Sequence, residues 1–281
     1  MTKILVLVLA FFTYQDVDKC LESLIKQKKD FKKANVADSD EDIDDKLDTK
    51  EDIEIDIKVL ENPSQYSDKM KEVCTKYSDH GVEHYMSNKN IEMACFQVFS
   101  SQNKEKFMLE YDYICVSEGD VILKDGSMLE CFNLINNKQP LCAINVSLEN
   151  IKIPPHPPSA IHWMPPHKTF DDHLEGPSGL QFVMFTSKYY YDFLDALEKK
   201  TLSVAIPLGC KVQHFSDTNL RAFMARTNVK EYKTKYHDLV HIGWNHFLDP
   251  KDEYWNFRTN LINEKKIRVP HDLSKVLFEK L

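Results

Sequence analysis

The chain has 281 residues, of which 42% are hydrophobic and 28% are charged, and its formal net charge is −8. This size and composition exclude a disordered or fibrous chain and fit one large α/β domain, or a domain with a substantial extension. Eleven acidic residues and two lysines lie between Asp38 and Asp56, a local charge of −9, so the rest of the chain sums to about +1. That near-neutral remainder does not by itself indicate a nucleic-acid or membrane partner.

The seven cysteines are scattered and include no C-x-x-C pair, which predicts buried free thiols in a reducing compartment. The apolar run Ile4–Phe12 has one preceding lysine and no small-residue cleavage site. We therefore expect a buried first strand over 3–10 rather than a signal peptide. Elsewhere no apolar run approaches the roughly 20 residues that cross a bilayer. These features predict a protein without a transmembrane segment, located in the cytoplasm.

Strands and helices alternate in the first half of the sequence. After strand 3–10, the apolar spacing of Val17–Ile25 predicts a helix that ends in the basic stretch Lys26–Lys33. Residues 36–52 are expected to form a disordered acidic insertion. The elements that follow are strand 54–60, helix 66–77, strand 82–86, helix 90–108 and strand 113–117. This alternation predicts a parallel sheet with crossover helices.

The second half has a different pattern. Residues 150–175 are rich in proline and histidine and are expected to form a stiff loop, because the histidine spacing does not match the usual zinc sites. The later elements are strand 181–187, helix 188–197, helix 217–225, a short apolar strand over 238–244 and helix 250–262.

Two carboxylates follow the apolar strand Tyr113–Ser117, in the tripeptide Glu118-Gly119-Asp120. Ligands in open parallel sheets bind beyond the carboxyl ends of strands, where paired carboxylates can hold a hard divalent cation. The intervening glycine would let the backbone approach a phosphate. The alternative is a surface turn with two solvated acids.

Four segments, in order, resemble the glycosyltransferases of the GT-A fold, of the family 2 type. They cover about residues 3–125 and are Ile4–Gln27, Asn62-Pro63-Ser64, Ser87–Ile91 and Glu118-Gly119-Asp120. The resemblance implies an α/β, Rossmann-related, mostly parallel central sheet flanked by helices, with an acceptor-side extension. It also implies a nucleotide-sugar donor, UDP- or GDP-linked, and a divalent cation, Mn²⁺ or Mg²⁺.

The resemblance also assigns site residues. Asp120 and Glu118 would hold the cation, and His241 would complete the metal or diphosphate shell, its alternative being a hydrogen-bonded core histidine. The donor would be contacted by Phe11, Asn62, Asn88, Asn90 and Glu118. The sequence departs from the family pattern in having Glu118 where aspartate is usual and no glycine after Asn90. The first departure makes Asp120 the safer metal ligand. The second, together with a first turn that lacks the usual asparagine or arginine, leaves the identity of the nucleotide open.

Two carboxylates are candidates for the base that accepts the acceptor's proton. Asp217 opens a predicted helix, as the family's base does, although an N-cap aspartate would look the same. Glu175, in a glycine-containing loop that resembles the acceptor-side turn, is the second candidate.

The sequence thus predicts a metal-dependent hexosyl- or pentosyltransferase, with inversion at the sugar. Residues 1–150 would bind the donor and 151–281 the acceptor, which would be a glycan, a protein or a modified DNA base. The alternative is a non-catalytic GT-A-like module that binds a nucleotide or glycan. A hydrolase or nucleotidyltransferase is less favoured, because the sequence has no Gly-rich phosphate loop and no G-x-S-x-G motif.

Overall fold

The computed structural model of the 281-residue chain describes residues 1–37, 52–137, 139–147, 168–177, 179–202, 213–247, 249, 251–263 and 273–281. Most of the expected acidic insertion and most of the proline- and histidine-rich loop lie outside these residues. The described part of that loop, 168–175, forms two short paired strands instead of a continuous loop.

Strands and helices alternate up to residue 118. They are β1 (Thr2–Ala10), α1 (Tyr14–Ala37), β2 (Ile53–Glu61), α2 (Ser67–Lys76), β3 (Val82–Ser87), α3 (Ala94–Gln102), α4 (Lys104–Glu110) and β4 (Tyr113–Glu118). The later elements are β5 (Val121–Leu123), α5 (Ser127–Asn137), β6 (Leu141–Val146), β7 (Lys168–Thr169), β8 (Leu174–Glu175), β9 (Phe182–Thr186), α7 (Ser187–Glu198), α8 (Asp217–Thr227), β10 (Tyr232–His241), α9 (Glu253–Asn263) and β11 (Phe278–Lys280). Three short 3₁₀ helices complete the described chain, η1 (Ser78–His80), η3 (Ile242–Phe247) and η4 (Leu273–Lys275).

The described strands form a single sheet in the order β11-β3-β2-β1-β4-β9-β6-β10-β8-β7, with β5 paired to β10. The run β3-β2-β1-β4 is parallel, as predicted for the first half of the chain. β1 lies at its centre, where both faces are covered, because its run of β-branched and leucine side chains has no solvent-facing alternation. β9 then lies antiparallel between β4 and β6.

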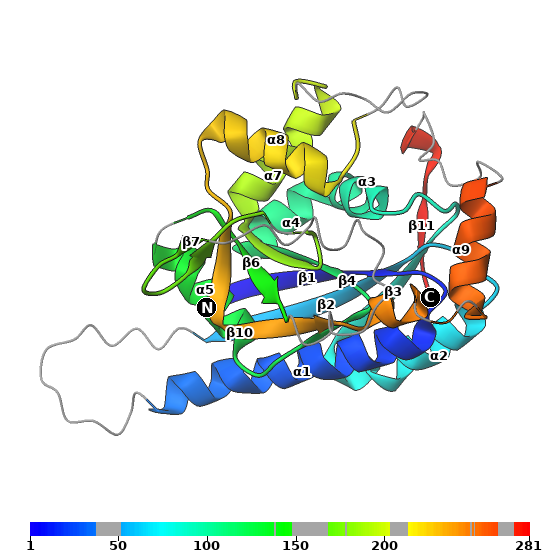
Figure 1. Cartoon of the computed structure of the whole chain (residues 1–281), viewed down its shortest axis with the longest axis horizontal. Helices are drawn as coiled ribbons and strands as arrows, with labels where there is room; N and C mark the ends of the chain where they lie inside the picture. The colour runs from blue at the N-terminus through cyan, green and yellow to red at the C-terminus, as the bar shows by residue number, and fades with distance from the viewer. Residues whose placement is uncertain are drawn as a thin grey trace, which may run out of the picture.

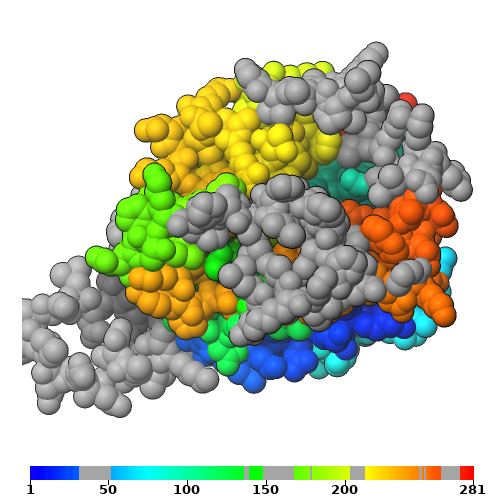
Figure 2. All heavy atoms as spheres, in the orientation of Figure 1, coloured from blue at the N-terminus to red at the C-terminus, as the bar shows by residue number. Residues whose placement is uncertain are grey.

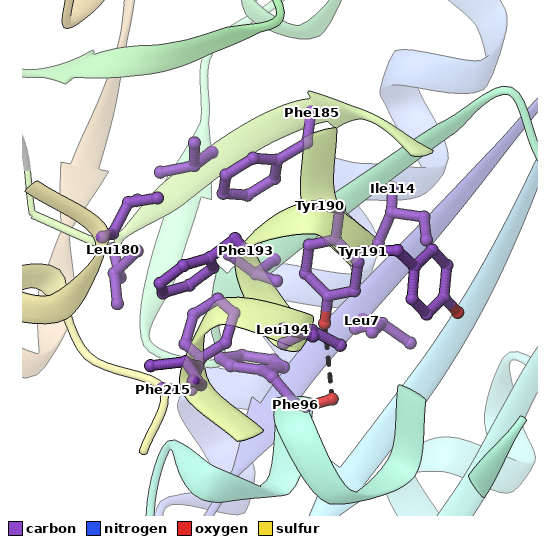
Figure 3. Close-up of a cluster of buried hydrophobic side chains, with 14 of the residues drawn as sticks. Leu7, Phe96, Ile114, Leu180, Phe185, Tyr190, Tyr191, Phe193, Leu194 and Phe215 are labelled. Carbon is purple, nitrogen blue, oxygen red and sulfur yellow. Dashed lines mark hydrogen bonds between the residues drawn. The ribbon is translucent and has the colours of Figure 1, made fainter. Parts of the chain in front are cut away.

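Helices cover both faces of the sheet (Figure 1). α1, α2 and α5 pack on one hydrophobic cluster, and α3, α4, α7 and α8 pack on the other. Figure 3 shows part of the second cluster, in which aromatic side chains of α7 meet Phe96 of α3 and Phe215 before α8. The hydroxyl of the fully buried Tyr190 donates to the Phe96 carbonyl at 3.3 Å, so this polar group is satisfied inside the core.

Two helix predictions differ from the structure. The basic stretch Lys26–Lys33 does not end α1, which continues to Ala37, because lysines are good helix formers and do not stop a helix. The helix expected over 90–108 is two helices, α3 and α4, joined at Asn103. The Asn103 amide donates to the Phe99 carbonyl at 2.8 Å and so competes with the backbone bonds of a continuous helix.

The cysteine prediction agrees with the structure where it can be compared. Six cysteines are buried and free, and Cys210 lies outside the described residues. Among the helices that the structure describes, none combines the length and the apolar character that crossing a membrane requires.

Candidate functional site

The acidic pair lies at the carboxyl end of β4, in the middle of the sheet. Glu118 is the last residue of β4, and Asp120 lies in the turn that leads into β5. A Cβ atom on Gly119 would lie 2.5 Å from the carbonyl oxygen of Leu9 and 2.9 Å from Val17. Glycine is therefore required here because the turn packs against the end of β1. The packing alone explains the glycine, without the approach of the backbone to a phosphate that the sequence suggested.

His241 reaches the acidic pair from the end of β10. β10 pairs antiparallel with β5, and His241 lies opposite Val121, one residue after Asp120. Its Nε2 lies 3.0 Å from Glu118 Oε2 and 3.9 Å from Asp120 Oδ1. One ligand atom from each of the three residues lies within 4.8 Å of the others. The structure thus brings together the three residues that the sequence analysis grouped as metal ligands.

The segment after β10 fixes the position of Asp120. The Asp120 carbonyl accepts from the backbone N–H of Ile242 at 2.9 Å and of Gly243 at 3.2 Å. A Cβ atom on Gly243 would lie 1.8 Å from Asp120 Oδ2, so only glycine leaves room for this carboxylate. Trp244 stacks on the His241 ring, with 4.6 Å between ring centroids, and so restricts the orientation of the imidazole.

The pKa values of Asp120 and His241 depend on each other and on the charge of Glu118. Burial raises the pKa of Asp120, the charge of His241 lowers it, and Glu118 raises it again. Burial lowers the pKa of His241, but the negative charges of Asp120 and Glu118 outweigh burial and raise it to about 9. At neutral pH the imidazolium therefore offsets part of the negative charge of the acidic pair. Two carboxylate oxygens and one imidazole nitrogen form a donor set that suits Mn²⁺ or Mg²⁺, and binding the cation would release the imidazolium proton.

Asp217 lies in the first turn of α8, but it is not the N-cap. The N-cap is Ser216, whose hydroxyl accepts from the Asn219 N–H at 3.3 Å. Burial raises the pKa of Asp217, Arg221 lowers it, and the charge of Glu118 raises it. A half-buried carboxylate that senses Glu118 and has a raised pKa is suited to accept a proton.

Glu175 has a different environment. It accepts from Lys230 Nζ at 2.9 Å and lies 3.7 Å from His173 Nε2. Its bond to Lys230 lowers the pKa of Glu175, so this carboxylate is a weaker proton acceptor than Asp217. His173 stacks between Phe170 and Tyr232, at 4.6 and 3.8 Å between centroids. Glu175 thus lies in a network that holds the edge strands β7 and β8.

The three asparagines assigned to the donor hold the protein's own loops. The buried Asn62 accepts from the Ile91 N–H at 2.8 Å and donates to the Glu92 carbonyl at 3.4 Å. Asn88 binds backbone groups of the C-terminal segment, accepting from the Leu277 N–H at 3.2 Å. The Asn90 side chain accepts from the Glu92 N–H at 3.1 Å. These contacts give each asparagine a structural role, and their contact with a donor stays a prediction.

Phe11, the remaining donor candidate, belongs to an aromatic cluster at the carboxyl end of β1. Phe12 is stacked on Phe257 of α9 at 4.9 Å between centroids, and Tyr254 of α9 lies 6.4 Å from Phe11 and 5.6 Å from Phe12. Phe12 has a φ of 63°, in the left-handed region that is unfavourable for a bulky residue. The cluster therefore holds this turn in a strained conformation.

α9 is fastened to the body by polar contacts that the sequence analysis did not find. His246 lies 2.7 Å from Asp16 at the start of α1 and 2.7 Å from Asp252 just before α9. The Tyr66 hydroxyl donates to both oxygens of Glu253, at 2.6 Å each. In Figure 2 the orange surface of α9 lies against the blue and cyan surfaces of α1 and α2. No sequence motif predicts these contacts. The pairs Tyr66–Glu253 and Asp16–His246 join residues more than 180 positions apart, and His246–Asp252 lies in a short turn.

α9 also brings side chains to the acidic pair. Burial raises the pKa of Tyr254 to about 12, Arg258 lowers it, and the charges of Asp120 and Glu118 raise it. Burial likewise raises the pKa of Glu92, and Arg258 opposes this effect. Tyr254 thus lies close enough to the acidic pair to sense its charge, and Arg258 lies near both Tyr254 and Glu92. Neither Tyr254 nor Arg258 was among the predicted site residues.

Comparison with known proteins identifies the fold. No family model matches the chain, and no curated protein matches it in sequence. The solved structure of S. aureus TarS 1-349 matches with a TM-score of 0.50 at 12% identity, over 96% of this chain and 67% of that one. TarS 1-349 in complex with UDP-GlcNAc matches with the same TM-score at 11% identity, over 96% and 68%.

A second kind of solved structure agrees. GalNAc-T7 with UDP, GalNAc and Mn²⁺ matches with a TM-score of 0.53 at 9% identity, over 85% of this chain and 43% of that one. This chain also spans only 41% of the longer TarS chain. The matched structures are GT-A glycosyltransferases, and identities this low show a shared fold alone. The chain thus has a GT-A-like α/β fold, a mixed sheet with a parallel core flanked by helices.

Proposed function

We propose that this protein is a metal-dependent glycosyltransferase that uses a nucleotide-sugar donor. The observation that carries the proposal is the cluster of Glu118, Asp120 and His241, drawn from two distant segments to the carboxyl edge of a GT-A-like sheet. The TarS structure with UDP-GlcNAc and the GalNAc-T7 structure with UDP, GalNAc and Mn²⁺ support the choice of a UDP-sugar and manganese. The first acid is glutamate, so Asp120 is the principal ligand in this proposal.

The roles of the residues follow from their positions. Glu118, Asp120 and His241 would hold Mn²⁺ or Mg²⁺, which when bound neutralises the charge of a departing nucleoside diphosphate. Asp217 accepts the proton of the acceptor hydroxyl as that oxygen bonds to the sugar's anomeric carbon. The bond between this carbon and the diphosphate oxygen breaks, and the electron pair leaves with the diphosphate. Attack opposite the leaving group inverts the anomeric carbon. The acceptor would be a glycan, a protein or a modified nucleotide.

The test distinguishes the role of the metal ligands from the role of the base. Donor hydrolysis is measured for UDP-glucose, UDP-GlcNAc, UDP-galactose, UDP-GalNAc and GDP-mannose with Mn²⁺, beside calorimetric titration with UDP. Asp120→Asn is expected to weaken Mn²⁺-dependent UDP binding at least 10-fold, because it removes a charged ligand. Asp217→Asn should bind UDP normally but lose roughly 10²- to 10⁴-fold in turnover.

Asp192→Asn is the matched control, because Asp192 is an exposed carboxylate of α7 paired only with Lys188 among the contacts described for it. This variant should behave as the wild type in both measurements. Unchanged metal dependence in Asp120→Asn would contradict the metal site. Mn²⁺-dependent binding without hydrolysis of any donor would instead favour the non-catalytic nucleotide-binding module.

A further inference from the structure

A pocket of about 440 Å³ lies between α5 and β10, on a different part of the molecule from the acidic pair. Among the described residues that line this α5–β10 pocket, Leu129 and Leu134 contribute apolar surface, and Tyr236 and His237 contribute aromatic rings. Asn133 and Asp172 add polar groups. No lysine or arginine is among the described lining residues. The pocket is large enough for a sugar ring.

The pocket exists because β10 is bulged. The register between β10 and β6 shifts between Lys233 and Asp238, so the residues between them do not pair with β6. The Glu130 carboxylate accepts from their backbone N–H groups, at 2.6 Å for Lys235, 3.1 Å for Tyr236 and 2.8 Å for His237. The bulge is thus a satisfied, built feature that turns two aromatic side chains outward, and such bulges recur next to functional sites.

Tyr236 is rigid as well as exposed. Its side chain is 66% exposed, yet its hydroxyl donates to the Asp171 carbonyl at 2.5 Å. The Lys235 ammonium lies 5.1 Å from the ring centroid and donates to the Phe170 and Asp171 carbonyls at 2.9 Å each. A ring fixed by its hydroxyl and covered on one face by Lys235 offers its other face without a rotamer cost on binding. In Figure 2 the orange surface of this part of the chain adjoins the green surface of residues 168–177.

A two-stranded ribbon joins the pocket to the acidic pair. β10 carries Tyr236 and His237 at the bulge and His241 at its end, four residues from His237, or about 13 Å along a strand. Its antiparallel partner β5 leads from Asp120 to Gly126, which also lines the pocket. One ribbon therefore carries metal-site residues at one end and pocket residues at the other. An acceptor several sugar units long can span this separation.

We propose that the α5–β10 pocket binds one neutral sugar unit of a glycan acceptor, at a distance from the unit that receives the transferred sugar. The proposal rests on the proposed function for its choice of glycan. The exposed Tyr236 ring offers an aromatic face for the C–H groups of a pyranose. Glu130 and Asp172 are both among the described lining residues, and their negative charge favours a neutral sugar over a phosphorylated or carboxylated one.

The first test is binding without any nucleotide or metal. Maltotetraose, chitotetraose, cellotetraose and mannotetraose are titrated into the full chain and followed by ligand-observed NMR. At least one is expected to bind, and Tyr236→Ala should weaken that binding at least 10-fold. Tyr236→Phe keeps the ring, so its loss should stay within about threefold. Tyr189→Phe, a change in α7, is the matched control and should have no effect.

The proposal is overturned if none of the four tetrasaccharides binds, or if Tyr236→Ala binds as tightly as the wild type. A second readout is UDP-sugar hydrolysis, which needs no acceptor and should be unchanged in Tyr236→Ala. Loss of tetrasaccharide binding with normal hydrolysis assigns the pocket to the acceptor. Hydrolysis that is absent in the wild type contradicts the proposed function and leaves the binding result to decide the pocket.

Discussion

Gly243 controls the candidate metal site although it carries no ligand atom. An alanine Cβ there would lie 1.8 Å from Asp120 Oδ2, so the carboxylate must move. We expect Gly243→Ala to weaken Mn²⁺ binding roughly 10- to 100-fold, the usual cost of disturbing the support of a metal ligand. The measurement is a calorimetric Mn²⁺ titration.

Gly119→Ala is the informative comparison for this prediction. Its Cβ would meet the Leu9 carbonyl at 2.5 Å, a backbone atom that cannot move aside. Gly119→Ala should therefore lower the melting temperature, whereas Gly243→Ala should lower metal affinity at nearly unchanged melting temperature. Unaltered Mn²⁺ affinity in Gly243→Ala would show that Asp120 is not a ligand.

At the scale of single residues, the sequence predicted site residues that are close together in the chain or that lie at the end of a strand. Glu118 and Asp120 follow a buried strand, and a histidine at the end of a later strand can reach the same edge of the sheet. The Asp16–His246–Asp252 contact was not predictable, because an N-terminal aspartate and a distant histidine carry no shared pattern. The asparagines were chosen by resemblance, and resemblance does not say which backbone groups they satisfy.

α9 is the element whose attachment is easiest to weaken selectively. The Tyr66 hydroxyl donates to Glu253, while the Tyr66 ring packs edge-on against Phe12 at 4.9 Å. Tyr66→Phe keeps the ring and removes this hydrogen bond. Amide hydrogen exchange in α9 should then rise roughly fivefold, with α3 as the internal control. An equal rise in both helices would indicate global destabilisation, and no rise would mean that Glu253 does not hold α9.

At the scale of elements, direction was harder to predict than existence. β1, β2 and β4 were predicted because apolar runs separated by helical spacing imply parallel crossovers. β9 was predicted as a strand, but its antiparallel place between β4 and β6 depends on partners more than 40 residues away. The apolar sequence of a strand buried on both faces does not indicate whether the strand pairs parallel or antiparallel. β5, α5, β6 and β11 were missed, and the division of the chain near residue 150 stays a prediction.

The stability of the whole molecule should depend on pH through His246. Its bond to Asp16 raises the pKa of His246 from 6.5 to about 9, burial opposes this, and Asp252 adds to it. Because the pKa is raised in the folded state, the stabilisation is fully present below about pH 6.5 and is lost as the pH rises through about 9. A rise from 6.5 to about 9 corresponds to at most about 3 kcal/mol.

The measurement is urea unfolding of the wild type and His246→Gln between pH 6 and 10. The difference in unfolding free energy between them should be largest at pH 6 and shrink by pH 10. Groups that titrate equally in both proteins cancel in this difference. One of them is Lys233, whose pKa burial lowers to about 8 and whose effect on stability with pH is opposite to that of His246. A difference that is constant with pH would contradict the role of His246.

The placement of β9 in the sheet has a consequence for how the chain is made. β4 pairs with β9, with Tyr113 opposite Thr186. β6 pairs with the other edge of β9, with Leu141 opposite Phe185. During synthesis, both strands leave the ribosome before the strand that separates them. Until about residue 186 has emerged, each presents an unpaired apolar edge to other nascent chains. The centre of the sheet is therefore completed only after both of these strands have left the ribosome, and a chain stalled before that point exposes their edges to aggregation.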